Sequence, residues 1–320
     1  MSKILTVSLP PHIHAPGSVA ACMWRVNLAL LPAFGCALYF FGLGAAIVTV
    51  VSVLSCIFFE YAITRWMLGR TPHIADGSAA LTGFLLALNL PSTLPVWTVI
   101  IGAFVAIGIG KMAFGGLGCN IFNPALVGRV FLLLSFPVQM TNWQLPGVDR
   151  LAYTDAATGA TTLQMLKTGA VDASDIDLWN LTFGAIGGSL GEVSAVAILI
   201  GFIYLLVAKV ITWHIPVSIF LSVTVLSFIA GVNPVIELLS GGLLLGAVFM
   251  ATDYVTSPMT GKGMIIYGLL IGAITIIIRR WGAYPEGMSF AILIMNGFTP
   301  LINRCMKPKR FGAAGRAVRA

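Results

Sequence analysis

The chain has 320 residues, of which 58% are hydrophobic and only 9% charged, against roughly 25% charged residues in a typical soluble domain. Its 18 Lys and Arg against 11 Asp and Glu give a net charge of +7, but the basic residues are not clustered in the aromatic-interleaved pattern of a nucleic-acid-binding face. A water-soluble domain and a nucleic-acid partner are therefore excluded, and the basic residues are expected to set membrane topology.

Apolar runs between polar breaks predict ten membrane segments. These are residues 22–42, 44–64, 77–90, 94–112, 121–138, 191–208, 215–232, 237–251, 264–279 and 287–303. Two stretches, 26–59 and 77–110, contain no charged residue, and each exceeds the about 20 residues that a spanning helix needs. The third and eighth segments are short and run into Leu90-Pro91 and Ser257-Pro258, which predicts helices that break inside the protein.

Five segments precede the polar stretch 139–189 and five follow it, so the two halves are expected to have opposite orientations. Leu81-Thr-Gly-Phe-Leu-Leu in the third segment resembles Leu239-Ser-Gly-Gly-Leu-Leu in the eighth, which favours a duplication, although small-residue helix packing alone also produces such similarities. The predicted fold is an all-α polytopic membrane protein with about 10 transmembrane helices, in two inverted five-helix halves with broken helices.

The distribution of Lys and Arg predicts the orientation. With both termini in the cytoplasm, 13 basic residues lie on the cytoplasmic side, 4 on the far side and Arg129 inside the fifth segment, and only Arg279-Arg280 forms a discordant cluster. We expect a cytoplasmic N-terminal segment, a first transmembrane half, an extracytoplasmic loop, a second transmembrane half and a basic cytoplasmic tail. Their boundaries are 1–21, 22–138, 139–189, 190–303 and 304–320.

The extracytoplasmic loop contains the run Asp155-Ala-Ala-Thr-Gly-Ala-Thr161. Thr158-Gly159 is consistent with a simple turn in a solvated loop. The hydroxyl of Thr161 also follows two small residues, Gly159 and Ala160, so it is expected to be an unhindered acceptor for an enzyme that grips the backbone.

This run resembles the flavinylation motif found in the D component of the Rnf complex and in the B component of the sodium-translocating NADH:quinone oxidoreductase. Further similarities to the same family lie along the chain. They are Pro11-His-Ile-His, Gly115-Gly-Leu-Gly-Cys-Asn-Ile-Phe-Asn-Pro-Ala-Leu-Val-Gly128, Ala251-Thr-Asp-Tyr-Val-Thr-Ser-Pro-Met-Thr-Gly261 and Pro285-Glu-Gly-Met-Ser-Phe-Ala-Ile-Leu-Ile-Met-Asn296. The short segment before the first span favours the Rnf protein over its quinone-reductase relative.

The resemblance implies that Thr161 carries FMN through a phosphodiester bond, installed from FAD by a flavin transferase. It implies a subunit of an ion-translocating ferredoxin:NAD⁺ oxidoreductase in the inner or plasma membrane of a bacterium or archaeon, with Na⁺ or H⁺ as the translocated ion. The chain has neither a dinucleotide fingerprint nor an Fe–S cysteine set, so it is not active alone. Expected partners are Fe–S subunits, a second flavinylated subunit and the lipid bilayer; a second, non-covalent flavin such as riboflavin stays open.

Other residues of the flavin motif and of the 115–128 stretch are candidate cofactor contacts. Asp155, Thr158, Gly159 and Ala160 are expected to support attachment or flavin binding. Asn120 and Asn123 offer uncharged amides just before a helix expected to begin at Pro124, and such a helix start favours a negative partner, such as a reduced flavin. A tight turn with helix caps is the simpler alternative.

Ionisable groups near apolar membrane segments usually form ion pairs or lie along the path of a transported ion or proton. Asp253, beside hydroxyl-bearing residues, is the candidate for holding Na⁺ or relaying a proton, although helix capping explains it equally well. Glu60, near a predicted cytoplasmic end, is expected to reach the surface. The five cysteines lack metal-ligand spacing, so no metal site is predicted.

Two other functions fit the same architecture. A secondary transporter or channel for a small solute would also have ten spans and inverted halves. A structural membrane anchor would need no cofactor. The Thr161 motif favours the redox subunit, because neither alternative requires it.

Overall fold

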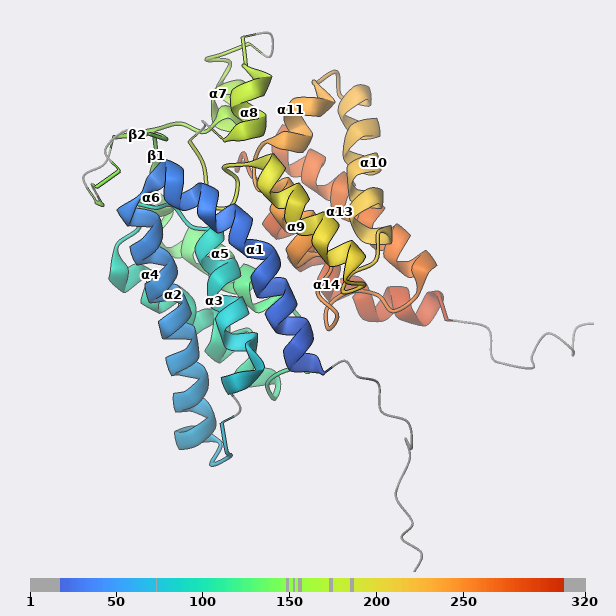
Figure 1. The fold of residues 1–320 in the computed structure, drawn as a ribbon. Coiled ribbons are helices and arrows are strands. Elements are labelled where there is room, and N and C mark those ends of the chain that lie inside the picture. The colour runs from blue at the N-terminus through green and yellow to red at the C-terminus, as the bar shows by residue number, and fades with distance from the viewer. Residues whose placement is uncertain are drawn as a thin grey trace, which may run out of the picture.

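A computed structural model describes residues 18–307 except 73, 148–149, 152, 155–156, 173–174 and 185–186. Asp155, the Pro11-His-Ile-His motif and most of the terminal segments therefore lie outside the described residues. The described part of the chain is mostly helical (Figure 1). Its only strands among the described residues are β1 (Trp143–Gln144) and β2 (Thr158–Gly159), which pair antiparallel.

The ten predicted segments are all present as helices. The first half contains α1 (Val19–Phe41), α2 (Leu43–Ala62) continued by η1 (Ile63–Met67), α3 (Ser78–Leu88), α4 (Val96–Phe104) continued by η3 (Val105–Ile109), and α5 (Pro124–Ser135), with short turns η2 (Ile74–Asp76) and η4 (Met112–Phe114). The second half contains α9 (Ala195–Val207), α10 (His214–Ile229), α11 (Pro234–Leu239), α12 (Leu243–Leu245) continued by η5 (Gly246–Met250), α13 (Gly261–Trp281) and α14 (Met288–Cys305). Between the halves lie α6 (Pro137–Met140), α7 (Thr162–Thr168) and α8 (Leu178–Phe183).

The eighth segment differs from the single short helix expected over 237–251. It breaks at Ser240, before α12 begins. Part of the reason is local: Gly241 and Gly242 both have positive φ, at 69° and 57°, which interrupts the helix between α11 and α12.

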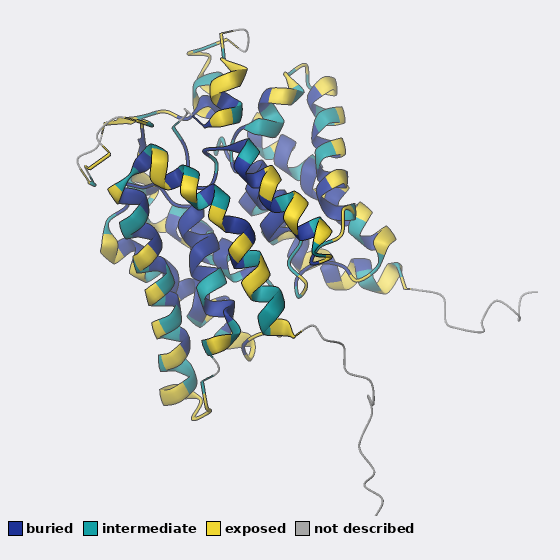
Figure 2. Ribbon diagram, viewed as in Figure 1, coloured by how far each residue is buried: buried dark blue, intermediate teal, exposed yellow. Residues whose placement is uncertain are grey.

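The exterior of the helices is apolar. Four helical stretches are long and apolar enough to cross a membrane by length and composition, at Val19–Phe41, Leu43–Met67, Val96–Phe114 and Gly261–Trp281. Figure 2 shows exposed residues along the outer sides of α1, α2 and α9, and on α2 these include Val50, Leu54 and Phe58. Because exposed apolar rows of this kind are stable in lipid and not in water, the chain is a multi-pass membrane protein.

Both ends of the described chain lie at one face, which we call the terminal face, and α7 and α8 lie at the opposite loop face (Figure 1). Equivalent helices of the two halves pack against each other, α1 on α9 and α5 on α14. At the first crossing a Cβ on Gly201 would collide with the backbone carbonyl of Ala29, so glycine is needed there for close approach. These contacts fit two inverted halves around a shared interface.

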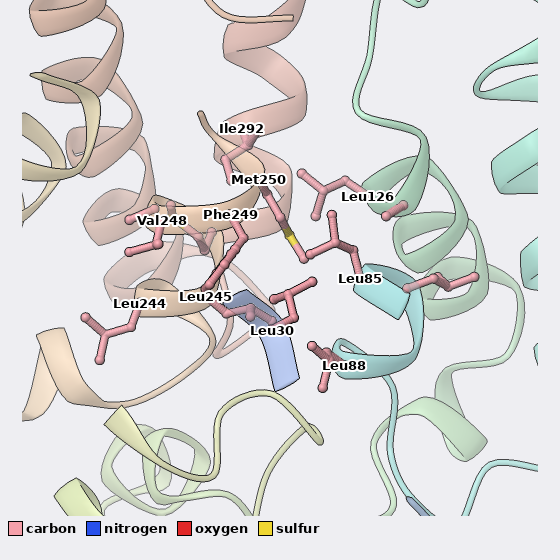
Figure 3. Close-up of a cluster of buried hydrophobic side chains, with 14 of the residues drawn as sticks. Leu30, Leu85, Leu88, Leu126, Leu244, Leu245, Val248, Phe249, Met250 and Ile292 are labelled. Carbon is pink, nitrogen blue, oxygen red and sulfur yellow. The ribbon is translucent and has the colours of Figure 1, made fainter. Parts of the chain in front are cut away.

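The two broken helices meet in the protein interior. Figure 3 shows Leu85 of α3 beside Met250 at the end of η5, with Leu126 of α5 next to both. The Asn89 amide, at the C-terminal end of α3, donates to the Met250 sulfur at 3.6 Å. The interior ends of both half-length helices are thus fixed by protein rather than by lipid.

Each half carries a buried ion pair beside the outer end of its broken helix. At the terminal face, Lys111 Nζ lies 2.6 Å from Glu60 and donates to Ser78, the first residue of α3. At the loop face, Arg279 lies 2.6 Å from Glu237 and donates to the carbonyls of Ser240 and Gly241, just before α12.

These pairs change two expectations. Glu60 does not reach the surface, because Lys111 holds it in the interior with 9% of its area exposed. Arg279, one residue of the discordant Arg279-Arg280 cluster, is buried and paired at the loop face. It therefore stabilises the protein interior and does not count against the predicted orientation.

Candidate functional site

Thr161 lies at the loop face, between a small β ladder and a short helix. Gly159 pairs with Trp143 in the ladder, where a Cβ would come within 2.9 Å of Leu145. Two residues later Thr161 caps α7, and its Oγ1 accepts a hydrogen bond from Gln164 N at 3.3 Å. The sequence forms this cap because a threonine oxygen satisfies a free N–H at a helix start.

The cap changes the expected accessibility of the Thr161 hydroxyl. Thr158 and Ala160 are exposed, but Thr161 keeps only 5% of its area exposed. The unhindered hydroxyl expected from the small neighbours is therefore wrong for this packed arrangement. Whether Thr161 carries a cofactor is a separate question, and that assignment stays a prediction.

Two hollows adjoin this segment. Thr161 itself lines a small hollow, together with the Gly187-Gly188 turn, Glu192 and the Ser240-Gly241 break. One helical turn onward, Gln164 lines a second cavity, whose walls include Trp143, Tyr284 and Arg129.

Arg129 connects the second cavity to the junction of the halves. It is 4% exposed, and its guanidinium donates to Glu286, to Ser289 at 2.6 Å and to Asn89 at 2.9 Å. Because Asn89 ends α3 and Ser289 begins α14, this one cation ties both halves together beside the cavity. Its burial next to an acid fits the rule that intramembrane charges are paired.

The residues predicted near the other face are also brought together. Asn120, Asn123, Asp253 and Lys111 line one open cavity at the terminal face. Burial raises the pKa of the Asp253 carboxyl above its ordinary value, and a hydrogen bond from Thr256 at 3.1 Å partly offsets this effect.

The two asparagines have structural roles in this arrangement. Asn123 caps α5, since its Oδ1 accepts from Ala125 N at 3.1 Å, and its amide donates to the Met250 carbonyl at 3.3 Å. The Asn120 amide donates to the Phe122 carbonyl at 3.0 Å. The helix start expected at Pro124 is confirmed, and the capping interpretation describes its geometry.

Several functional candidates were missed by sequence reasoning. Lys111 and Arg279 were counted only as topology signals, and Glu237 and Glu192 were not singled out. A charge beside a long apolar run was the available signal for Glu192 and Lys111. No sequence signal identified their partners.

Comparison with known proteins identifies the family of the chain. The model of the NQR2, RnfD, RnfE family matches residues 6–312. The chain belongs to this family. It is 44% identical over 310 residues to the D component of the Na(+)-translocating ferredoxin:NAD(+) oxidoreductase complex of Acetobacterium woodii, covering 96% of this chain and 95% of that one.

Two further members of the NQR2, RnfD, RnfE family are similarly close. The D component of the proton-translocating ferredoxin:NAD(+) oxidoreductase complex of Clostridium ljungdahlii is 41% identical over 97% of both chains. The D component of the ion-translocating oxidoreductase complex of Stutzerimonas stutzeri is 41% identical, over 93% of this chain and 94% of its own. The family resemblance inferred from the motifs is therefore confirmed.

Proposed function

We propose that this chain is a membrane subunit of an ion-translocating ferredoxin:NAD⁺ oxidoreductase, passing electrons through FMN on Thr161 and coupling them to Na⁺ or H⁺ transport. The names of its relatives support the assembly. The flavin assignment rests on the position of Thr161. Thr161 lines one hollow, and it lies one helical turn from Gln164, which lines a larger cavity with aromatic walls.

The chemistry of the larger cavity fits a flavin ring. Trp143 and Tyr284 provide aromatic surface, the Gln164 side chain provides an amide, and the Arg129–Glu286 ion pair provides charged hydrogen-bonding groups. Cofactor sites commonly combine apolar walls with a few polar groups in this way. Bound FMN would supply one- and two-electron chemistry, while these residues hold the ring and keep water from it.

Attachment needs access that the packed loop does not give. The step joins Thr161 Oγ1 to the FMN phosphorus, breaks the pyrophosphate bond of FAD and releases AMP, while the hydroxyl proton passes to water. Because Thr161 is 5% exposed, we infer that the transferase acts before α7 packs against the membrane helices. The exposed Thr158 and Ala160 support its grip on the backbone, and Asp155 is assigned to the same step.

The proposed setting follows the charge distribution. The terminal face lies in the cytoplasm, the loop face lies outside, and the membrane is the inner or plasma membrane of a bacterium or archaeon. Electrons reach the loop face from other subunits, including a second flavinylated subunit and Fe–S subunits. This chain needs them because it has no dinucleotide fingerprint and no Fe–S cysteine set.

The cavity at the terminal face is the proposed entry for the ion. Asp253 is its acidic group, and Thr256 contributes a neighbouring hydroxyl oxygen. The mostly apolar walls of the same cavity are the proposed contact for a second flavin such as riboflavin. Asn120 and Asn123 would then position its walls, since their amides already bond within the protein.

Peptide mass spectrometry of the purified protein tests the flavin assignment. We expect FMN on the peptide containing Thr161, and its loss in Thr161→Ala with the protein still inserted in the membrane. Thr162→Ala is the matched control and should keep the flavin. A flavin on Thr158 or Thr162, or none at all, would contradict the assignment, and the last result would favour a transporter or an anchor.

A further inference from the structure

A third cavity at the loop face, which we call the basic cavity, lies between α7 and the ends of second-half helices. Lys167 lines it from α7, Glu237 from α11, and Arg279 and Arg280 from the last turn of α13. Figure 1 shows α7 and α11 at this face. The cavity volume of about 240 Å³ is many times the about 10–15 Å³ that one water requires, so there is room for a small anion.

The charged residues of the basic cavity leave a positive excess. Arg279 and Glu237 form the ion pair described above, at 2.6 Å, so their charges cancel. Lys167 and Arg280 also line the cavity, and the ion pairs of the described residues include neither of them. Two positive charges in one cavity therefore have no counter-charge in the described part of the chain.

Both of these cations keep N–H groups for a ligand. The Lys167 ammonium donates to the carbonyls of Gly282 and Tyr284, at 2.5 and 3.2 Å, which fixes its position and uses two of its three N–H groups. Arg280 is exposed, and its guanidinium donates to no residue within the described ranges. Burial lowers the pKa of the Lys167 ammonium below its ordinary value, and a neighbouring anion would offset that cost.

The basic cavity lies at the membrane boundary. The helix α13 is long and apolar enough to cross a membrane, and it ends at Trp281, which has 73% of its area exposed. Because tryptophan is enriched where the hydrocarbon core meets the lipid headgroups, the neighbouring Arg280 lies at the level of the headgroup phosphates. This is also the residue of the discordant basic cluster that no ion pair described above explains.

We propose that the basic cavity binds one phosphate group, carried by an anionic lipid headgroup or present as free phosphate. The planar Arg280 guanidinium offers paired N–H groups that match two phosphate oxygens, and Lys167 offers one more donor. Basic pockets between transmembrane helices bind anionic headgroups in other membrane proteins. The apolar walls, which include Leu166, Val232 and Ile236, suit the uncharged part of a lipid.

A phosphate in this position would hold α7 against the end of α13, because Lys167 belongs to one helix and Arg280 to the other. Since α7 begins directly after Thr161, the contact would steady the segment that carries the proposed flavin. That role rests on the proposed function. The phosphate site itself rests on the cavity and its two unpaired cations.

Two assays on the detergent-purified complex test the site. Native mass spectrometry counts bound phosphatidylglycerol, with phosphatidylcholine as the lipid without net charge, and equilibrium dialysis measures binding of radioactive inorganic phosphate. Arg280→Gln should weaken the binding by about tenfold or more, as expected for the loss of a charged hydrogen-bond donor. Arg150→Gln is the matched control and should bind like the wild type, since Arg150 is an exposed arginine of the loop outside the cavity.

The two assays separate the sources of the phosphate. A preference for phosphatidylglycerol that Arg280→Gln removes would identify a lipid headgroup, whereas binding of inorganic phosphate alone, with the same dependence on Arg280, would identify the free anion. No binding in either assay, or equal binding by the wild type and Arg280→Gln, would overturn the proposal. If Arg280→Gln fails to assemble, Lys167→Gln decides in its place. A complex without flavin on Thr161 would reject the proposed function and leave both measurements readable.

Discussion

Replacing Lys111 by methionine isolates the ion pair at the terminal face. Lys111 is 2% exposed, and its ammonium group donates to Glu60 at 2.6 Å and to Ser78 at 2.7 Å. Methionine has a similar unbranched shape, so the variant removes the charge with little loss of packing. The Ser78 hydroxyl keeps its bond to Asp76 at 2.9 Å, which leaves Glu60 as the group without a partner.

The expected cost follows from leaving one charge buried and unpaired. Removing one partner of a buried pair costs about 3–5 kcal/mol, whereas replacing both by apolar residues is often close to neutral. Lys111→Met should therefore lower the free energy of unfolding by about 3–5 kcal/mol. The double variant Lys111→Met with Glu60→Met should recover most of that loss, because no buried charge remains.

Reversible unfolding of the detergent-solubilised protein measures both variants. Arg65→Met, at an exposed position near the same face, is the control and should stay within about 0.5 kcal/mol of the wild type. Equal destabilisation by the single and double variants would refute the reasoning, since the cost would then come from packing and not from an unpaired Glu60. A single variant as stable as the control would refute it too.

Three further outcomes are expected. Gly201→Leu should destabilise the protein by about 1–3 kcal/mol in the same unfolding assay, because a side chain there meets the Ala29 carbonyl; wild-type stability would contradict the close crossing. A cysteine at the exposed Thr168 should react with an impermeant maleimide in intact cells whose outer membrane, if present, is permeabilised, and labelling only after lysis would invert the orientation. Asp253→Asn should abolish ion uptake in sealed vesicles while electron transfer continues; equal loss of both with less protein would indicate a structural cap.

The helices were predictable because their signal is local. A membrane segment is recognised by an uninterrupted apolar run, and all ten runs form helices near the expected positions. The break at Gly241-Gly242 was not expected, since Leu239-Ser-Gly-Gly-Leu-Leu remains apolar across it. Its cause is partly remote: Arg279 takes the carbonyls of Ser240 and Gly241 from another helix.

The candidate site was predictable only as residue types. Asn120, Asn123 and Asp253 line one cavity although more than 120 residues separate the asparagines from the aspartate. The burial of Thr161 was missed because small neighbours indicate access, while the cap that buries it depends on how α7 packs.

Pairings between distant charges had no sequence signal. Glu60 and Lys111 are 51 residues apart, and each is plausible alone at a membrane surface. Only the fold brings the two side chains together. Considering Glu60 by itself therefore predicted that it reaches the membrane surface, whereas the structure has a buried ion pair.

The half-length helices constrain how this chain enters the bilayer during synthesis. The 11 residues of α3 extend about 16 Å, about half of a hydrocarbon core of about 30 Å, and the stretch from Leu243 to Met250 is shorter still. Neither is a self-sufficient insertion signal, because each would leave backbone groups in lipid without partners. We expect both to settle only after the long helices have inserted, so that a cysteine introduced into α3 should be accessible to aqueous thiol reagents in a nascent chain released at residue 95.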